Sequence, residues 1–202
     1  MIAIVDYGVG NLFSLRSSFA KIGADTVVTA DKSVIESADK IILPGVGAFA
    51  DAAKKLQDTG LGEVVKTQAK LGKPIMGICL GMQLLFERSF EYGEHQGLGL
   101  IKGDVVPMKG YIADSLKVPH IGWNGLSFPK KHFLFSQLKE GDCAYFVHSY
   151  FATNCDESVI ATTEYGKVLT AAVASGNVMG CQFHPEKSGD VGLAILRAFC
   201  QA

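Results

Sequence analysis

The chain has 202 residues, of which 48% are hydrophobic and 19% are charged, and its formal net charge is -1. This composition excludes a disordered chain, which combines few apolar groups with a high net charge. The balance of 19 basic and 20 acidic residues supplies no basic field for binding phosphates, so we expect no nucleic-acid partner. No apolar run reaches the roughly 18 residues of a membrane-spanning helix, and we expect no membrane partner. The length predicts a single domain over residues 1–202.

The N-terminus and the cysteines indicate the compartment. Residues 1–6 contain no basic segment, long apolar segment or cleavage signature, so we expect a cytoplasmic location. The five cysteines form an odd set without a C-x-x-C pair, which favours reduced thiols over a disulfide framework or a zinc finger. We therefore expect no metal site.

Strand and helix patterns alternate in the first half of the chain. Short runs rich in Val, Ile and Ala, separated by helical patterns, are typical of a mostly parallel sheet covered on both faces. The strands expected from these runs cover residues 2–5, 26–29, 40–43 and 74–78.

Three helices are expected between these strands. The first has apolar residues at helical spacing over 12–22 and ends at Gly23, a residue type that commonly follows a helix C-terminus. The second begins near Ser33, which has capping-box spacing to Glu36. The third places its apolar face over 61–69.

The second half of the chain is richer in strands. Residues 142–182 are β-rich, and we expect hairpins there that extend the sheet. Turn residues divide this segment at Asn154, Gly166 and Gly176-Asn177. A last helix begins at Ser188 or Asp190. The predicted fold is an α/β sandwich, with a mixed, mostly parallel central sheet and helices on both faces.

The segment Gly77-Ile78-Cys79-Leu80-Gly81 has the layout of a nucleophile elbow, with cysteine at the position of the nucleophile. A buried strand precedes it and a helical pattern follows it through Phe86, so Cys79 is expected on a strained strand-to-helix turn. The positive end of the helix dipole favours the thiolate, which is the nucleophilic form. The alternative is that Cys79 is an ordinary buried cysteine; the elbow context favours catalysis.

A catalytic thiolate needs a histidine as proton shuttle and a third group to orient it. His184 lies at the end of an apolar strand, and Glu186 follows two positions later. We expect this segment to be extended by Pro185, so that both side chains face the same way and Glu186 orients His184. His-Pro-Glu alone is also compatible with an ordinary strand-end turn, and His120 and His148 remain rival bases.

Three motifs together resemble the class-I, or triad, glutamine amidotransferases. These are the elbow with Gln83 after it, the Gln-Phe-His-Pro-Glu segment ending at Glu186, and residues 44–47 (Pro-Gly-Val-Gly), which resemble the oxyanion strand of that family. Within the family, the chain is similar over residues 1–200 to the glutaminase subunits of imidazole glycerol phosphate synthases. The segments that carry this finer resemblance are 6–12, 118–124, 145–150 and Lys187.

The resemblance implies a glutaminase without a cofactor. Cys79 would attack the amide carbon of glutamine, giving a glutamyl thioester and ammonia, and water would release glutamate. The backbone N–H of Leu80 and one from the strand holding Val46 and Gly47 would stabilise the oxyanion. The glycines at 45 and 47 would let a peptide there rotate, so that the hole forms only when a partner is loaded. The implied glutamine contacts are Gly45, Gly47, Gln83, Glu91, Ser149 and Tyr150.

The same resemblance implies a partner that receives the ammonia. It would be a (β/α)₈-barrel cyclase subunit, forming a heterodimer that makes imidazole glycerol phosphate and aminoimidazole carboxamide ribotide in histidine biosynthesis. Asn11, Trp123, Tyr145 and Lys187 would face the barrel. The alternative for Trp123 is a core position, and that for Lys187 is a plain surface charge. For the glutamine contacts Gln83 and Glu91, the alternative is a solvated helix face.

Other readings explain fewer of these residues. Gly8-Val9-Gly10 resembles the start of a dinucleotide fingerprint, but Phe13 stands where the third glycine belongs. A cysteine peptidase or DJ-1-like hydrolase accounts for the elbow without Gln83 or Trp123, and a pure binding module leaves Cys79 dispensable. The nearest alternative is the glutaminase of anthranilate or guanylate synthesis, which usually carries His and Ser where this chain has Met82 and Lys187.

Overall fold

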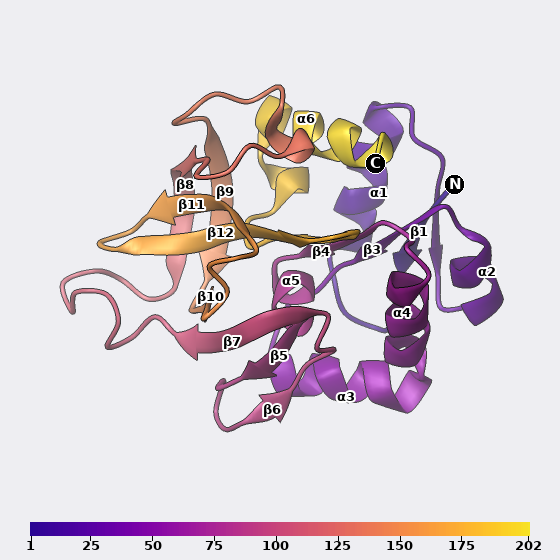
Figure 1. Cartoon of the computed structure of the whole chain (residues 1–202), viewed down its shortest axis with the longest axis horizontal. Coiled ribbons are helices and arrows are strands. Elements are labelled where there is room, and N and C mark those ends of the chain that lie inside the picture. Colours follow the sequence, from indigo (N-terminus) through magenta and orange to yellow (C-terminus); the bar gives the residue numbers. More distant parts are fainter.

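A nine-stranded sheet runs through the whole molecule in the computed structural model, which describes residues 1–202 (Figure 1). Its strands are β1 (Ile2–Val5), β2 (Thr26–Thr29), β3 (Lys40–Leu43), β4 (Ile75–Ile78), β8 (His120–Ser127), β9 (Cys143–His148), β11 (Val159–Glu164), β12 (Val168–Ser175) and β13 (Val178–Cys181). They are ordered β2-β1-β3-β4-β13-β12-β11-β8-β9. The first five strands of this order, β2 to β13, are mutually parallel, and every pairing from β13 through β12, β11 and β8 to β9 is antiparallel.

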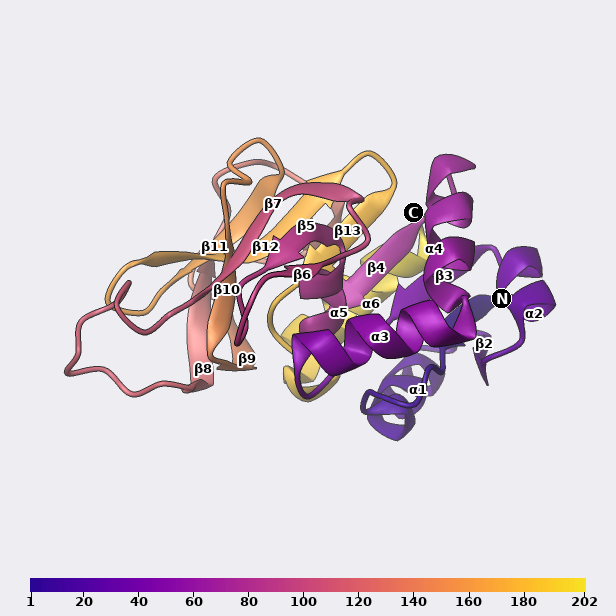
Figure 2. The same cartoon turned by 90° about the horizontal axis from the view of Figure 1, so that it is seen from below.

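Helices cover both faces of this sheet, which confirms the predicted fold class. On one face lie α1 (Leu12–Lys21), α6 (Gly189–Cys200) and the 3₁₀ turn η1 (Phe133–Phe135). The other face is covered by α2 (Lys32–Ser37), α3 (Phe49–Thr59), α4 (Leu61–Lys70), α5 (Leu80–Leu84) and a second sheet (Figure 2). None of these helices has both the length and the apolar character that crossing a bilayer requires.

The second sheet has four short strands. They are β5 (Phe86–Ser89), β6 (His95–Gln96), β7 (Ile101–Pro107) and β10 (Tyr150–Thr153), in the order β10-β7-β5-β6. The expectation that all strands of 142–182 extend the main sheet was therefore wrong for β10. The chain leaves the main sheet after His148 and enters the second sheet at Tyr150, so that Ser149 alone connects β9 to β10.

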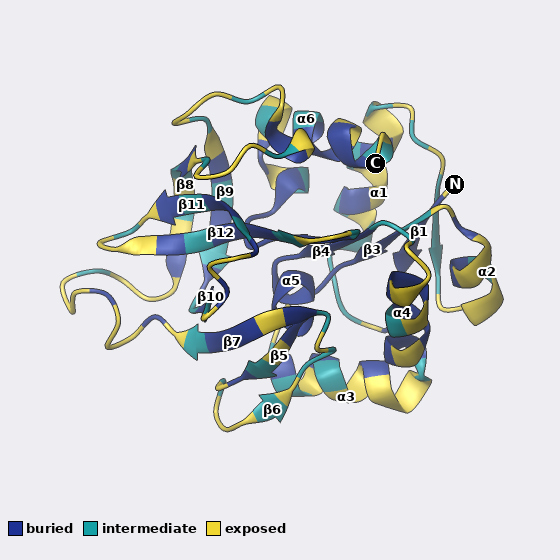
Figure 3. Ribbon diagram, viewed as in Figure 1, coloured by how far each residue is buried: buried dark blue, intermediate teal, exposed yellow.

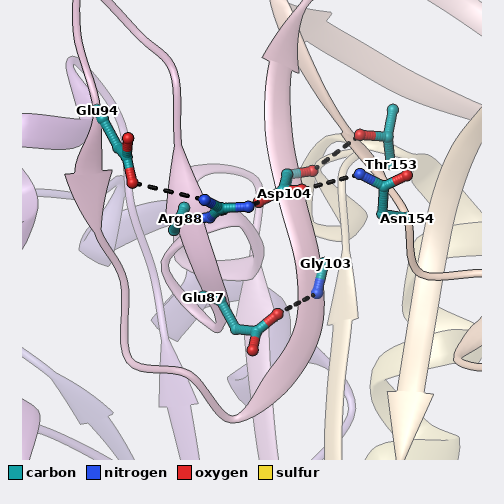
Figure 4. A network of polar contacts seen from close by, with 7 residues as sticks. All are labelled: Glu87, Arg88, Glu94, Gly103, Asp104, Thr153 and Asn154. Atoms are coloured by element: carbon teal, nitrogen blue, oxygen red, sulfur yellow. Dashed lines mark hydrogen bonds and ion pairs between the residues drawn. The ribbon is translucent and has the colours of Figure 1, made fainter.

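A polar network on β7 holds the strands of the second sheet together (Figure 4). Asp104 Oδ1 accepts from Arg88 of β5 at 2.9 Å, and its Oδ2 accepts from Asn154, just beyond β10, at 2.8 Å. Glu87 of β5 accepts from the backbone N–H of Gly103 at 3.0 Å. Asp104 is buried, so these bonds satisfy a carboxylate that would be costly to bury alone.

Most of the expected elements are present, with two corrections at helix ends. The cap of α2 is Asp31, whose side chain accepts from the Ser33 backbone N–H at 2.8 Å, so the capping box expected at Ser33 was wrong. The helix after Cys79 ends at Leu84, because the chain turns directly into β5 at Phe86. Helix α3 was not predicted.

Candidate active site

A cleft of about 670 Å³ opens where β3, β4 and β13 end. Its walls include Val46 and Gly47 after β3, Cys79 after β4, and His184 after β13. The carboxyl ends of parallel strands meet at one edge of a sheet, which is where open α/β sheets bind their ligands. The topology therefore gathers side chains that lie far apart in the sequence.

Cys79 occupies the strand-to-helix turn that the sequence predicts. It joins β4 to α5 with φ 55° and ψ -113°, a strained conformation for a residue with a side chain. A Cβ atom at Gly81 would overlap the carbonyl oxygen of Leu43, and one at Gly77 would lie 2.6 Å from the carbonyl oxygen of Gly81. Both positions must be glycine for the strand, the turn and the helix to pack this closely.

His184 and Glu186 form a buried pair beside Cys79. His184 Nδ1 lies 2.8 Å from Glu186 Oε1. The backbone between them is the 3₁₀ turn η2 (Pro185–Lys187), so the expected extended segment was wrong. Proline suits the first position of a helical turn, where its missing N–H costs nothing. His184, just before the turn, keeps an extended conformation with φ -99° and ψ 97°, and from there its ring reaches Glu186.

The electrostatic surroundings of His184 favour its protonated form. Burial by itself would lower the pKa of His184, but interactions with Cys79 and Glu186 outweigh it and raise the pKa to about 9. The Cys79 thiol lies 3.9 Å from the carbonyl oxygen of Val147, and the amide nitrogen of Gln182 lies 3.8 Å from the sulfur. The site thus places the Cys79 sulfur beside an imidazole that is held in its protonated form, the partner that a cysteine nucleophile requires.

The two rival histidines are committed to other partners. His120 and His148 are hydrogen-bonded to each other at 3.0 Å, and His148 also bonds to the Tyr150 carbonyl at 2.9 Å. Burial lowers the pKa of both rings, that of His148 to about 4. Both rings are thus engaged with other groups, and neither lines the cleft that holds Cys79.

The two glycines expected to make the oxyanion strand mobile lie in different surroundings. A Cβ at Gly45 would lie 2.7 Å from the Gly81 backbone nitrogen, so Gly45 is packed against the elbow and does not line the cleft. Gly47 has φ +94°, is exposed and has open space around it. Only Gly47 has room to change conformation. Just before them, the Pro44 carbonyl accepts from the Tyr7 hydroxyl at 2.6 Å, a support that the sequence did not reveal.

Five of the six expected glutamine contacts line the cleft: Gly47, Gln83, Glu91, Ser149 and Tyr150. Gln83 is buried and donates to the Tyr150 carbonyl at 3.2 Å and to Gln182 Oε1 at 2.9 Å. Glu91 lies in the turn after β5 and accepts from the Phe49 backbone N–H at 2.6 Å, at the start of α3. The alternative of a solvated helix face was wrong for both residues.

Further lining residues come from loops and were not predicted as site residues. They include Tyr92, Lys109, Val118 and Pro119. Tyr92 follows Glu91 in the turn after β5, and the other three lie between β7 and β8. Since such loops have no periodicity, only the folded chain brings these residues to the cleft.

Three of the expected partner residues lie together, Trp123 on β8, Tyr145 on β9 and Lys187 in η2. Trp123 is 54% exposed and lies opposite Tyr145, with the two rings edge to face at 6.0 Å. The ammonium of Lys187 lies 5.8 Å from the Tyr145 ring centre. The alternative of a core position for Trp123 was therefore wrong. Asn11 lies apart in sequence, at the N-terminus of α1.

A buried thiol on an elbow, next to a histidine paired with a carboxylate, is the arrangement of a cysteine nucleophile with its base. The family model for class-I glutamine amidotransferases matches residues 3–201. Proteins named imidazole glycerol phosphate synthase subunit HisH match nearly the full length. The relative from Sulfurimonas denitrificans is 55% identical, covering 98% of this chain and 97% of its own, and that from Lactococcus lactis is 48% identical, covering 99% and 98%.

Solved structures agree at the level of the fold. A glutamine amidotransferase superposes with a TM-score of 0.76 at 20% identity, covering 99% of this chain and 100% of its own. PurLQS from Thermotoga maritima gives 0.72 at 22% identity, covering 99% and 97%. The chain belongs to the class-I glutamine amidotransferase family, in the group of HisH subunits of imidazole glycerol phosphate synthase.

Proposed function

We propose that the chain is a glutaminase that hydrolyses glutamine to glutamate and ammonia and delivers the ammonia to a cyclase subunit. The observation that carries this proposal is the cleft in which Cys79, on its elbow, faces the buried pair of His184 and Glu186. The 55% identity to a subunit of imidazole glycerol phosphate synthase supports the choice of partner.

The proposed reaction has two steps. In the first, the Cys79 thiolate attacks the amide carbon of glutamine, a C–S bond forms, and the C–N bond breaks while His184 gives its proton to the leaving ammonia. In the second, neutral His184 takes a proton from water, whose oxygen attacks the thioester. The C–S bond then breaks, glutamate leaves, and the thiolate and the protonated His184 are restored. Glu186 holds the imidazole in one orientation throughout.

The tetrahedral intermediate carries a negative oxygen that needs fixed donors. We assign one to the Leu80 backbone N–H, at the start of α5, and the other to the segment holding Val46 and Gly47. Each such donor is worth about 3 to 4 kcal/mol. Since Gly47 is exposed and unobstructed, we propose that its peptide turns into place only when the partner is docked and loaded.

Substrate recognition is assigned to the polar side of the cleft. Gln83, Ser149 and Tyr150 would hold glutamine, and the carboxylate of Glu91 would attract its α-ammonium group. Gln83 and Glu91 are already hydrogen-bonded to backbone groups. The substrate therefore meets polar groups that are fixed before it binds, which lowers the entropy cost of recognition.

The exposed face of β8–β9 is the proposed docking surface for a (β/α)₈-barrel cyclase. Ile121 and Trp123 on β8 and Tyr145 on β9 form an apolar patch, with Lys187 beside it. Val147, which lies opposite Ile121, also lines the cleft. A partner docked there adjoins the site where ammonia forms, so the ammonia can reach the partner before water protonates the ammonia. The barrel would use this ammonia to make imidazole glycerol phosphate and aminoimidazole carboxamide ribotide in histidine synthesis.

Glutamate release tests this assignment. We expect the chain alone to hydrolyse glutamine slowly, and the cyclase with its ribotide ligand to accelerate the reaction strongly, whereas an anthranilate or guanylate synthase partner does not. Cys79→Ala abolishes turnover, and Cys143→Ala, which removes an exposed thiol, is the matched control that retains it. A full rate from the lone chain would contradict the switching of Gly47. Turnover that survives Cys79→Ala would contradict the mechanism.

A further inference from the structure

A buried pair of histidines lies beside the cleft and takes no part in the reaction proposed above. His120 and His148 stand directly opposite each other on β8 and β9, and the two residues are 1% and 6% exposed. His120 stacks on Phe146 and Tyr165, with ring centres 5.1 and 4.0 Å away. Two rings with so little contact with water must be fixed by their hydrogen bonds.

The hydrogen bonds determine which nitrogen of His148 carries the proton. A backbone carbonyl only accepts, so the Nδ1 atom of His148 carries the hydrogen that is donated to Tyr150 at 2.9 Å. Its Nε2 is then an acceptor, and His120 Nδ1 donates to it at 3.0 Å. Burial keeps His148 neutral at ordinary pH by lowering its pKa to about 4. His120 therefore locks His148 in a single tautomer.

The Tyr150 carbonyl connects this pair to the cleft. The same oxygen accepts from the side-chain amide of Gln83 at 3.2 Å, and that amide also donates to Gln182. Ser149 and Tyr150 form the crossing between the two sheets and line the cleft together with Gln83. The position of one carbonyl thus sets both the backbone of the crossing and the side chain of Gln83.

We propose that His148 is a positioning residue for glutamine, because its Nδ1–H fixes the Tyr150 carbonyl and thereby Gln83 and the polar wall of the cleft. This inference rests on the proposed glutaminase function. His148 touches no reacting atom, so its removal should weaken the binding of glutamine more than it slows the chemical step.

Two substitutions separate the hydrogen bond from the bulk of the ring. In His148→Asn the amide nitrogen takes the place of Nδ1 and can still donate to the Tyr150 carbonyl. In His148→Gln the amide nitrogen lies one atom further out, near the former Nε2, and the Nδ1 donor is lost. His132, a half-buried histidine outside the cleft, supplies the matched control His132→Gln.

Steady-state glutamate release is measured for each variant in complex with the cyclase and its ligand. We expect His148→Gln to raise KM for glutamine about tenfold, as the loss of one buried hydrogen bond predicts. His148→Asn should stay within about threefold of the wild type, kcat should change less than KM in both, and His132→Gln should leave KM unchanged.

Equal KM values for His148→Asn and His148→Gln would overturn the proposal, because the effect would then follow the lost ring and not the lost donor. An unchanged KM in His148→Gln would overturn it as well. If His148→Gln does not fold, His120→Phe keeps the stacking and removes the lock on the tautomer. That variant should raise KM about threefold, and an unchanged KM there would also overturn the proposal. A wild-type complex that releases no glutamate would instead refute the glutaminase function itself.

Discussion

The parallel and antiparallel halves of the main sheet supply different parts of the site. Strands β1, β4 and β13 are buried along their whole length, and the ends of β3, β4 and β13 present Gly47, Cys79 and His184 to the cleft. On β8 and β9, buried residues alternate with partly and fully exposed ones (Figure 3). The reactive groups thus stand on a buried frame, and the residues assigned to the partner stand on a half-exposed one.

This difference indicates which changes each half tolerates. A thiol and an imidazole must keep their geometry within a fraction of an ångström, and strands packed on both faces provide that rigidity. A docking face must stay accessible and needs only complementary shape and chemistry. Substitutions in the parallel half should therefore act on the chemical step, and those on the exposed face of β8–β9 should act on assembly.

The largest effect is expected within the parallel half. His184→Ala removes the proposed base and should lower kcat about 10²- to 10⁴-fold. Glu186→Gln keeps the base and removes the charge that orients it. The fall in kcat should therefore be smaller than in His184→Ala, by about tenfold or more. Measurements of kcat in the assembled complex test both. Equal losses in the two variants would show that the pair acts as one inseparable unit.

A smaller effect, and a different one, is expected on the antiparallel half. Trp123→Ala should weaken binding of the cyclase about 30-fold, as for an exposed aromatic at the centre of an interface. In the free Trp123→Ala chain, iodoacetamide should alkylate Cys79 at the same rate as in the wild type. Phe133→Ala, which removes an exposed aromatic from η1, is the control and should leave the affinity unchanged. An unaltered affinity in Trp123→Ala would place the interface elsewhere.

The smallest effect, taken per pH unit, is the pH dependence of folding, to which the two halves contribute with opposite sign. The folded-state pKa of His184 is raised to about 9, so its contribution to stability is complete below about pH 6.5 and disappears as the pH rises to 9. The pKa of His148 is lowered to about 4, so its contribution is complete above about pH 6.5 and disappears as the pH falls to 4.

Each group changes the free energy of unfolding by up to about 1.4 kcal/mol per pH unit within its window. Urea unfolding from pH 4.5 to 9.5 measures both limbs. His184→Ala should flatten the alkaline limb and leave the acid limb in place, whereas His148→Asn should do the reverse. A variant that flattens the other residue's limb would contradict the assignment.

The sequence predicted the parallel strands and the elbow because local signals determine them. Strands buried on both faces read as continuous apolar runs, and the elbow pattern at Cys79 lies within five residues. Gly77 is required by the carbonyl oxygen of Gly81 in the same turn, whereas Gly81 is required by the carbonyl oxygen of Leu43 on the neighbouring strand. The pairing of His184 with Glu186 was predicted correctly, but the backbone between them was not. His-Pro-Glu alone does not distinguish an extended segment from a strand end followed by a 3₁₀ turn.

The second sheet was beyond local reasoning. Its strand β5 reads Phe-Glu-Arg-Ser, with two charged residues in four, and its partners are chosen by contacts such as Arg88 with Asp104 and Asp104 with Asn154. Glu91 reaches the cleft only because the start of α3, forty-two positions earlier, donates to it. These contacts exist only in the folded chain, so no window of the sequence contains them.

The arrangement of the cleft has a consequence for synthesis on the ribosome. The thiol at 79 emerges while the imidazole at 184 and the crossing at 149–150 have not yet been translated, and the walls of the cleft come from both sheets. A nascent chain that exposes only the elbow has a nucleophile without its base or its substrate wall. The growing polypeptide therefore cannot hydrolyse cellular glutamine before its last strands are in place.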